Sequence, residues 1–183
     1  MAGYNFTDDV RRALQVAREE ALKLRHDQVE PLHILQGILR APGATCTAAL
    51  GRLSAEPKML SSAILSVVPG PSREPAAGPD IPYAGSAKRV LEGAMVEARD
   101  LHHPYVAPEH LVLGVLRQGG EAATILGHAG VTLEGFRAIL RELGQLQESA
   151  NEWQVMRLPP SLIGWVALIV AVVALLLAIR AQP

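Results

Sequence analysis

The residues best suited to chemistry are four potential metal ligands in the second half of the chain, His102, His103, Glu109 and His110. Imidazole nitrogens and carboxylate oxygens are common zinc ligands. A metal site also requires its ligands to converge, and this spacing does not guarantee that geometry. Two of the histidines have counterparts at the same spacing in the first half of the chain, which is typical of residues duplicated with a fold. The sequence therefore predicts packing or turn-fixing histidines and no metal site.

The single cysteine and two glutamates are the other candidates for catalysis. Cys46 has no base beside it in the sequence, so we expect a buried structural thiol rather than a nucleophile. Because it is the only cysteine, an internal disulfide is excluded. Glu20 and Glu97 are expected to be solvated or ion-paired charges rather than an acid–base couple. No motif combines a nucleophile, a base and an orienting acid, and the sequence predicts neither an enzyme nor a cofactor site.

The composition indicates a helical protein that does not bind nucleic acid. The 183 residues include 17 Lys and Arg against 18 Asp and Glu, and the resulting net charge of −1 provides no basic field for a phosphate backbone. Only 4% of the residues are aromatic, so the core must be built from aliphatic side chains. This argues against an all-β fold, which favours aromatic and β-branched residues.

The chain contains an internal repeat. Residues 6–40, shifted by 77 positions, align without a gap on residues 83–117. In each copy the apolar residues recur with the period of a helix, and Pro31 or Pro108 fits the first position of a second helix. Shorter third and fourth helices are expected after them. The identical pairs are Arg12/Arg89, Leu14/Leu91, Ala17/Ala94, Glu20/Glu97, Ala21/Ala98, Leu24/Leu101, His26/His103, Val29/Val106, Pro31/Pro108, His33/His110, Gly37/Gly114, Leu39/Leu116 and Arg40/Arg117.

These patterns predict an all-α fold of two tandem four-helix repeats, residues 1–68 and 83–148. The two repeats are expected to pack as one pseudo-twofold domain, because each alone is so small that its core would be marginal. Residues 69–82 contain five prolines and two glycines and are predicted to be a mostly extended linker. A spacer at residues 149–160 would lead to a transmembrane helix at residues 161–180.

That last prediction rests on an apolar segment near the C-terminus. The 18 residues from Leu162 to Ile179 carry no charge, and as a helix of about 1.5 Å per residue they would cover roughly 27 Å of a bilayer. Trp165 lies near the start of this segment, where an indole suits the headgroup region. We predict a single-pass tail anchor and not a pore, because no polar residue lines it. No apolar signal segment occurs at the N-terminus, so the rest of the chain is expected in the cytoplasm.

The duplicated pattern resembles a known protein family over residues 4–146. Each copy follows F-T-x-x-V/A-x-x-x-L-x-x-A-x-x-E-A, then H-x-x-V, and then a second helix related to P/T-E-H-L-L-x-G-L. This double pattern is similar to the Clp N-terminal (Clp R) domain of the Clp ATPase chaperones. The resemblance implies a module that binds adaptor proteins and substrates beside AAA+ ATPase rings. The 183 residues contain no G-x-x-x-x-G-K-[ST] motif and therefore no P-loop.

The resemblance also implies where phosphoarginine could bind. Some bacterial relatives hold it with one site per repeat, using a threonine at the start of the first helix and a glutamate just before the histidine of the second. The first copy has Thr7, but Leu32 stands at the glutamate position; the second has Glu109, but Ala84 stands at the threonine position. Neither repeat has both residues, so we expect no complete site. Any site that survives would depend on Glu109, because a carboxylate binds a guanidinium strongly.

Two basic pairs, Arg11 with Arg12 and Lys88 with Arg89, occur at the same place in each repeat. They are expected on an exposed helix face, and contact with acidic adaptor surfaces or lipid headgroups is the sharper alternative. Together these features predict a non-catalytic, membrane-tethered module that recruits clients, adaptors or a Clp-type AAA+ ATPase and its protease to a bilayer.

Two other functions stay open on the sequence alone. The domain could instead sequester adaptors away from Clp ATPases. In a different class, the transmembrane helix could scaffold a membrane complex, although the span has no G-x-x-x-G motif.

Overall fold

The computed structural model describes residues 5–72 and 81–155, with residues 147–155 as helical backbone only. The described part contains eight α-helices, four in each repeat, as the sequence predicts. They are α1 (Asp8–Lys23), α2 (Pro31–Arg40), α3 (Gly43–Arg52) and α4 (Pro57–Val67), followed by α5 (Gly85–Asp100), α6 (Pro108–Gln118), α7 (Gly120–His128) and α8 (Leu133–Val155).

The helices begin at the residues that the sequence indicates. The Thr7 hydroxyl oxygen accepts a hydrogen bond from the backbone N–H of Val10 at 3.3 Å, which caps α1. Pro31, Pro57 and Pro108 each occupy the first position of a helix, where the missing N–H costs no hydrogen bond. Thr132 caps α8 by accepting from the backbone N–H of Gly135 at 3.2 Å.

Two short parallel pairings connect the repeats, and the sequence did not predict them. Strand β1 (Asn5–Phe6), before α1, pairs with β2 (Tyr105–Val106), before α6. The repeat-equivalent residues Tyr83 and Val29 form an isolated parallel bridge. Each repeat therefore pairs its N-terminal segment with the segment before the second helix of the other repeat. This reciprocal exchange is the pseudo-twofold arrangement that the repeat predicts.

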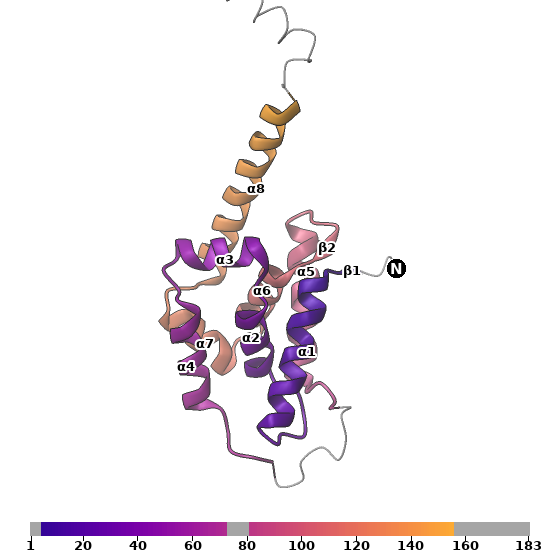
Figure 1. Ribbon diagram of the computed structural model, residues 1–183, viewed down its shortest axis with the longest axis vertical. Coiled ribbons are helices and arrows are strands. Elements are labelled where there is room, and N and C mark those ends of the chain that lie inside the picture. The colour runs from indigo at the N-terminus through magenta and orange to yellow at the C-terminus, as the bar shows by residue number, and fades with distance from the viewer. Residues whose placement is uncertain (1–4, 73–80, 156–183) are drawn as a thin grey trace, which may run out of the picture. The chain divides into compact units, whose positions relative to one another are not determined.

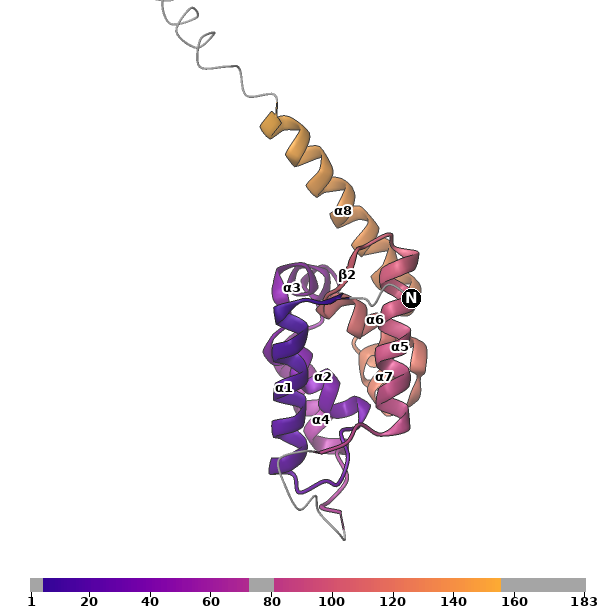
Figure 2. The ribbon, with the colours of Figure 1, turned by 90° about the vertical axis from the view of Figure 1, so that its right-hand side faces the viewer.

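The helices form layers in which the copies interlock (Figure 1): α2 and α6 lie between α1 and α5 on one side and α4 and α7 on the other. In the view of Figure 2, α1 of the first copy and α5 of the second lie on opposite sides. The third helix of each copy crosses over, because α3 packs against α6 and α7 packs against α2. One core of aliphatic side chains therefore runs through both repeats.

Two glycines allow the first and second helices of each copy to approach closely. A Cβ at Gly37 would collide with the backbone carbonyl of Ala13 in α1, and a Cβ at Gly114 would collide with that of Val90 in α5. Both positions lie inside helices, where glycine is otherwise unfavourable. Their identity in the two copies is therefore explained by helix packing.

The described residues up to Leu143 form one compact unit that contains both repeats, and α8 continues past this unit to Val155. Within residues 5–72 and 81–155, no helix is both long and apolar enough to cross a bilayer. The predicted span, Leu162 to Ile179 with Trp165, lies outside the described residues. The transmembrane helix stays a prediction from the sequence.

Candidate functional site

The exchange of segments brings Thr7 of the first repeat to the start of the second helix of the second repeat. The backbone N–H of Thr7 donates to the carbonyl oxygen of Val106 at 3.0 Å, three positions before Glu109. The next turn of α1 follows the same course, since a Cβ built at Gly43 would lie 3.1 Å from an oxygen of Asp9 and 3.6 Å from Pro108. The threonine and glutamate that the resemblance singles out therefore belong to one composite site.

This site corrects the expectation that each repeat must supply both residues itself. The repeats exchange their N-terminal segments, so the threonine of one copy meets the glutamate of the other. One site then contains Thr7 with Glu109, and the other contains Ala84 with Leu32. In that second site the backbone N–H of Ala84 donates to the carbonyl of Val29 at 3.1 Å, which is the equivalent of the Thr7 contact.

Glu109 is a buried carboxylate at the positive end of a helix. Its residue is 6% exposed, and it lies in the first turn of α6. Burial raises the pKa of the Glu109 carboxyl, its own backbone N–H lowers it, and the Asp9 carboxylate raises it further; the net pKa is above the ordinary value. Among the described residues, Glu109 has no ion pair to a Lys or Arg side chain. A guanidinium at this site would relieve the repulsion between Glu109 and Asp9.

Cys46 lies close enough to Glu109 to feel its charge. Burial raises the pKa of the Cys46 thiol far above its usual range, and the negative charge of Glu109 adds to this effect. A thiol that stays protonated is a poor nucleophile. The expectation of a buried structural cysteine is confirmed by its burial.

The counterpart in the first repeat is an open pocket of about 380 Å³. Leu32 and Pro31 at the start of α2 line it, together with Ser86 of α5 and the loop before α7. Glu30 crosses between the copies here, because its carboxylate accepts a hydrogen bond from the Ser86 hydroxyl at 2.7 Å. The two pseudo-equivalent sites therefore differ in their chemistry.

The paired histidines fix the turns between the first and second helices. His33 Nδ1 accepts the backbone N–H of Glu30 at 2.8 Å, so its proton lies on Nε2, which donates to His26 Nδ1 at 2.9 Å. His26 Nε2 then donates to the carbonyl of Pro69 at 3.1 Å. The second repeat contains the same pair, with 2.8 Å between His103 Nδ1 and His110 Nε2. Their turn-fixing role is confirmed.

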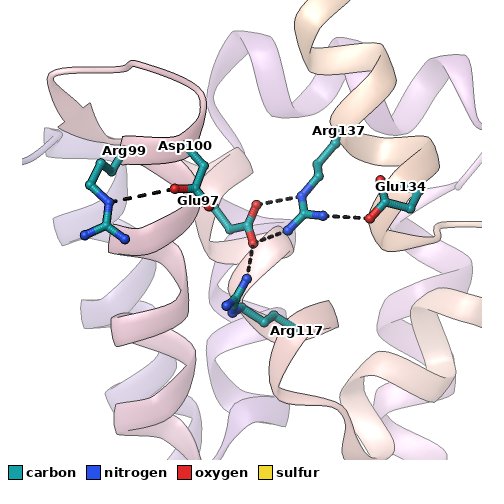
Figure 3. Close-up of polar contacts among 6 residues, drawn as sticks. All are labelled: Glu97, Arg99, Asp100, Arg117, Glu134 and Arg137. Atoms are coloured by element: carbon teal, nitrogen blue, oxygen red, sulfur yellow. Dashed lines mark hydrogen bonds and ion pairs between the residues drawn. The ribbon is translucent and has the colours of Figure 1, made fainter.

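The two recurrent glutamates are buried and ion-paired (Figure 3). Glu97 is fully buried and accepts hydrogen bonds from Arg137 at 2.6 and 2.8 Å and from Arg117 at 3.1 Å. Burial alone would raise the pKa of Glu97, but the hydrogen bonds and charges of Arg137 and Arg117 lower it below its ordinary value. Glu20 pairs with Arg40 at 3.0 Å in the first repeat. The expectation of paired charges is confirmed, and that of solvated ones is wrong.

The comparisons with known proteins agree with this geometry. The Clp repeat (R) N-terminal domain family matches residues 5–129 and 86–161. This chain belongs to that family. It is 36% identical over 148 residues to the negative regulator of genetic competence ClpC/MecB of Bacillus subtilis, a match that covers 80% of this chain and 18% of the relative. The chain thus corresponds to less than a fifth of the length of that relative.

Solved Clp N-terminal domains share the fold. The N-terminal domain of the chaperone ClpD from Arabidopsis thaliana is 27% identical with a TM-score of 0.59, and the match covers 80% of this chain and 97% of that one. A ClpV N-domain in complex with a VipB peptide has 20% identity and a TM-score of 0.59, and the match covers 74% of this chain and 87% of that one. The all-α fold class is therefore that of the Clp N-terminal domains.

The basic pairs of this Clp domain lie on exposed parts of α1 and α5, but they differ in their partners. Arg11 pairs with Asp8 at 2.8 Å, and Arg12 pairs with Asp9 at 3.5 Å. Lys88 and Arg89 are both exposed. Among the described residues, neither of them forms an ion pair. The second pair therefore offers more free positive charge to a partner than the first.

Proposed function

We propose that this chain is a non-catalytic protein-binding module, held at a membrane by residues 161–180, that recruits clients, adaptors or a Clp-type ATPase and its protease. The observation that carries the proposal is membership of the Clp N-terminal family through both repeats, in a chain whose sequence contains no P-loop motif. The ClpV N-domain solved with a VipB peptide is a relative of the same fold that binds a peptide. The apolar segment Leu162–Ile179 supports the membrane tether.

Crosslinking in intact cells tests recruitment. The tagged full-length chain is crosslinked, the membranes are solubilised, and co-purifying proteins are compared with those of a chain that contains only residues 156–183. We expect a Clp-type ATPase, its protease or their adaptors only with the full chain. Equal partners in the two samples would contradict the proposal and favour a scaffold that acts through its membrane segment.

A competitor that sequesters adaptors is distinguished by overexpression. A recruiter redirects proteolysis to membrane-associated substrates, whereas a competitor lowers the degradation of all substrates that depend on the adaptor. The rate of substrate loss in the soluble and membrane fractions separates these outcomes.

The composite site favours a second binding activity, the recognition of phosphoarginine by Thr7 and Glu109. A guanidinium would pair with the Glu109 carboxylate, which lies beside Asp9 and has no basic partner in the described part of the chain. We infer that this domain holds one such site, because the other site contains Ala84 and Leu32. Calorimetric titration with phosphoarginine should then give one site per chain, and Glu109→Gln should weaken binding at least tenfold.

A gain-of-function variant provides the sharper control for this activity. Ala84→Thr combined with Leu32→Glu rebuilds the lost pair at the pseudo-equivalent position and should raise the stoichiometry from one to two. Glu134→Gln, at an exposed position of α8, should change nothing. Unchanged binding in Glu109→Gln, or no binding by the parent chain, would contradict this activity without affecting the recruitment of other partners.

A further inference from the structure

The pocket of the first repeat has an acidic rim. Asp27, Glu30 and Glu121 are among its lining residues, and no Lys or Arg is. Asp27 and Glu121 are exposed, whereas Glu30 is half-buried. In the described part of the chain, none of the three is ion-paired to a basic side chain. The rim therefore carries three unneutralised negative charges.

These carboxylates remain available to a ligand. One oxygen of Asp27 accepts the Ser72 hydroxyl at 2.8 Å, and one oxygen of Glu30 accepts the Ser86 hydroxyl at 2.7 Å. The second oxygen of each can accept another hydrogen bond. The hydrogen bond from Ser72 also lowers the pKa of Asp27, so this carboxylate is charged at neutral pH.

The two histidines in the pocket do not offset this charge. His33 Nδ1 accepts the backbone N–H of Glu30, a bond that requires that nitrogen to be unprotonated. Burial lowers the pKa of His33 to about 4, and the charge of His26 lowers it further. Helices α2 and α7 begin at the pocket, but Glu30 and Glu121 already face their positive ends. A phosphate group would therefore be repelled.

The remainder of the pocket is apolar. Leu32 is 7% exposed and Ala122 is 2% exposed, and Val68 completes this surface. Leu32 occupies the position that Glu109 has in the other repeat. An apolar surface below an acidic rim suits a long basic side chain, whose alkyl stem packs on the surface while its charged end meets the carboxylates.

We infer that this pocket binds an unmodified arginine or lysine side chain next to an apolar residue in a protein segment. This inference rests on the proposed protein-binding function and names the partner chemistry at one of its sites. The charge complementarity of the rim selects the basic group, and the apolar surface selects its neighbour. The two pseudo-equivalent sites then select different ligands.

Fluorescence anisotropy tests this assignment on the full chain in phosphatidylcholine nanodiscs. The probe is a labelled peptide Ser-Gly-Leu-Arg-Leu-Gly-Ser, and the arms replace Arg by Glu, Arg by phosphoarginine, or both Leu by Ser. We expect the Leu-Arg-Leu peptide to bind at least tenfold more tightly than the Glu and phosphoarginine peptides. The Ser peptide should bind more weakly than the parent peptide, and added salt should weaken the parent.

Two charge-matched variants locate the site. Asp27→Asn with Glu121→Gln changes exposed positions on the rim and should weaken the parent peptide three- to tenfold. Glu19→Gln with Glu92→Gln removes the same charge at exposed positions outside the pocket and should bind as the parent chain does. Equal affinity of the rim variant and this control, or tighter binding of the phosphoarginine peptide, would overturn the inference alone. Absence of binding by every peptide would also overturn it, whereas the proposed function is judged separately by crosslinked partners in cells.

Discussion

At the scale of single residues, Glu97 shows how a carboxylate stays charged in this interior. It is fully buried, yet Arg137 alone donates two hydrogen bonds to it, one to each oxygen. Arg117 supplies a third donor from α6, so the carboxylate connects α5, α6 and α8 (Figure 3). A buried charge is costly when its partners are removed, because it cannot return to water.

Arg137→Met should therefore lower the free energy of unfolding by about 2–4 kcal/mol, since Glu97 would keep only Arg117. Urea unfolding of the full chain, followed by circular dichroism at pH 7, measures the change. Arg141→Met is the matched control, because Arg141 is exposed one helical turn later, and it should stay within about 0.5 kcal/mol of the parent. Adding Glu97→Gln to Arg137→Met should recover part of the loss. Equal stability of the two methionine variants would contradict the role of the pair.

The composite site shows where residue-level prediction from the sequence ends. Thr7 as an N-cap, Cys46 as a buried thiol and the histidines as turn-fixing residues all follow from local patterns, and the structure confirms them. The pairing of Thr7 with Glu109 depends on which repeat receives each N-terminal segment. No local spacing contains that information, because an exchanged and an unexchanged dimer of repeats have the same sequence pattern.

At the scale of elements, the helices were predictable and the strands were not. Helical period and prolines at the first position predict all eight helices, because both signals are local. Strands β1 and β2 have two residues each and form only through pairing with the other repeat, so they have no period of their own. The close approach of α1 and α2 was also hidden, although Gly37 and Gly114 recur in the sequence at equivalent positions.

Gly37→Ala should lower the stability by about 2–4 kcal/mol, because the new methyl group would meet the backbone of Ala13 in α1, which cannot move as a side chain can. Gly51→Ala is the matched control within α3, since no atom lies within 4 Å of a Cβ there. That control should gain about 0.5–1 kcal/mol, as expected for alanine in a helix. The midpoints of urea unfolding compare the two. A Gly37→Ala protein as stable as the parent would contradict the tight helix crossing.

At the scale of the whole molecule, duplication places the same pH-sensitive group twice in one core. Burial lowers the pKa of His33 to about 4 and that of His110 to about 4, with a smaller effect from the neighbouring histidine in each pair. Glu20 faces His33 and Glu97 faces His110, and both carboxylates act in the opposite direction. The pKa of His103 is lowered as well, also by burial. Because both repeats share one core, protonation in either one destabilises the same folded unit.

The full chain should therefore lose stability as the pH falls from about 6.5 to about 4. In this window the unfolded chain binds protons at these histidines and the folded chain does not, so the free energy of unfolding rises with pH, by on the order of 2–3 kcal/mol per histidine over the window. The raised pKa of Glu109 opposes this slope, whereas the lowered pKa values of Asp27 and Glu97 act at lower pH. Urea unfolding at several pH values measures the slope. It should flatten in a His33→Gln, His110→Gln variant, whereas His128→Gln, at an exposed position, should leave it unchanged; equal slopes in all three proteins would show that the paired histidines do not set the acid stability of the domain.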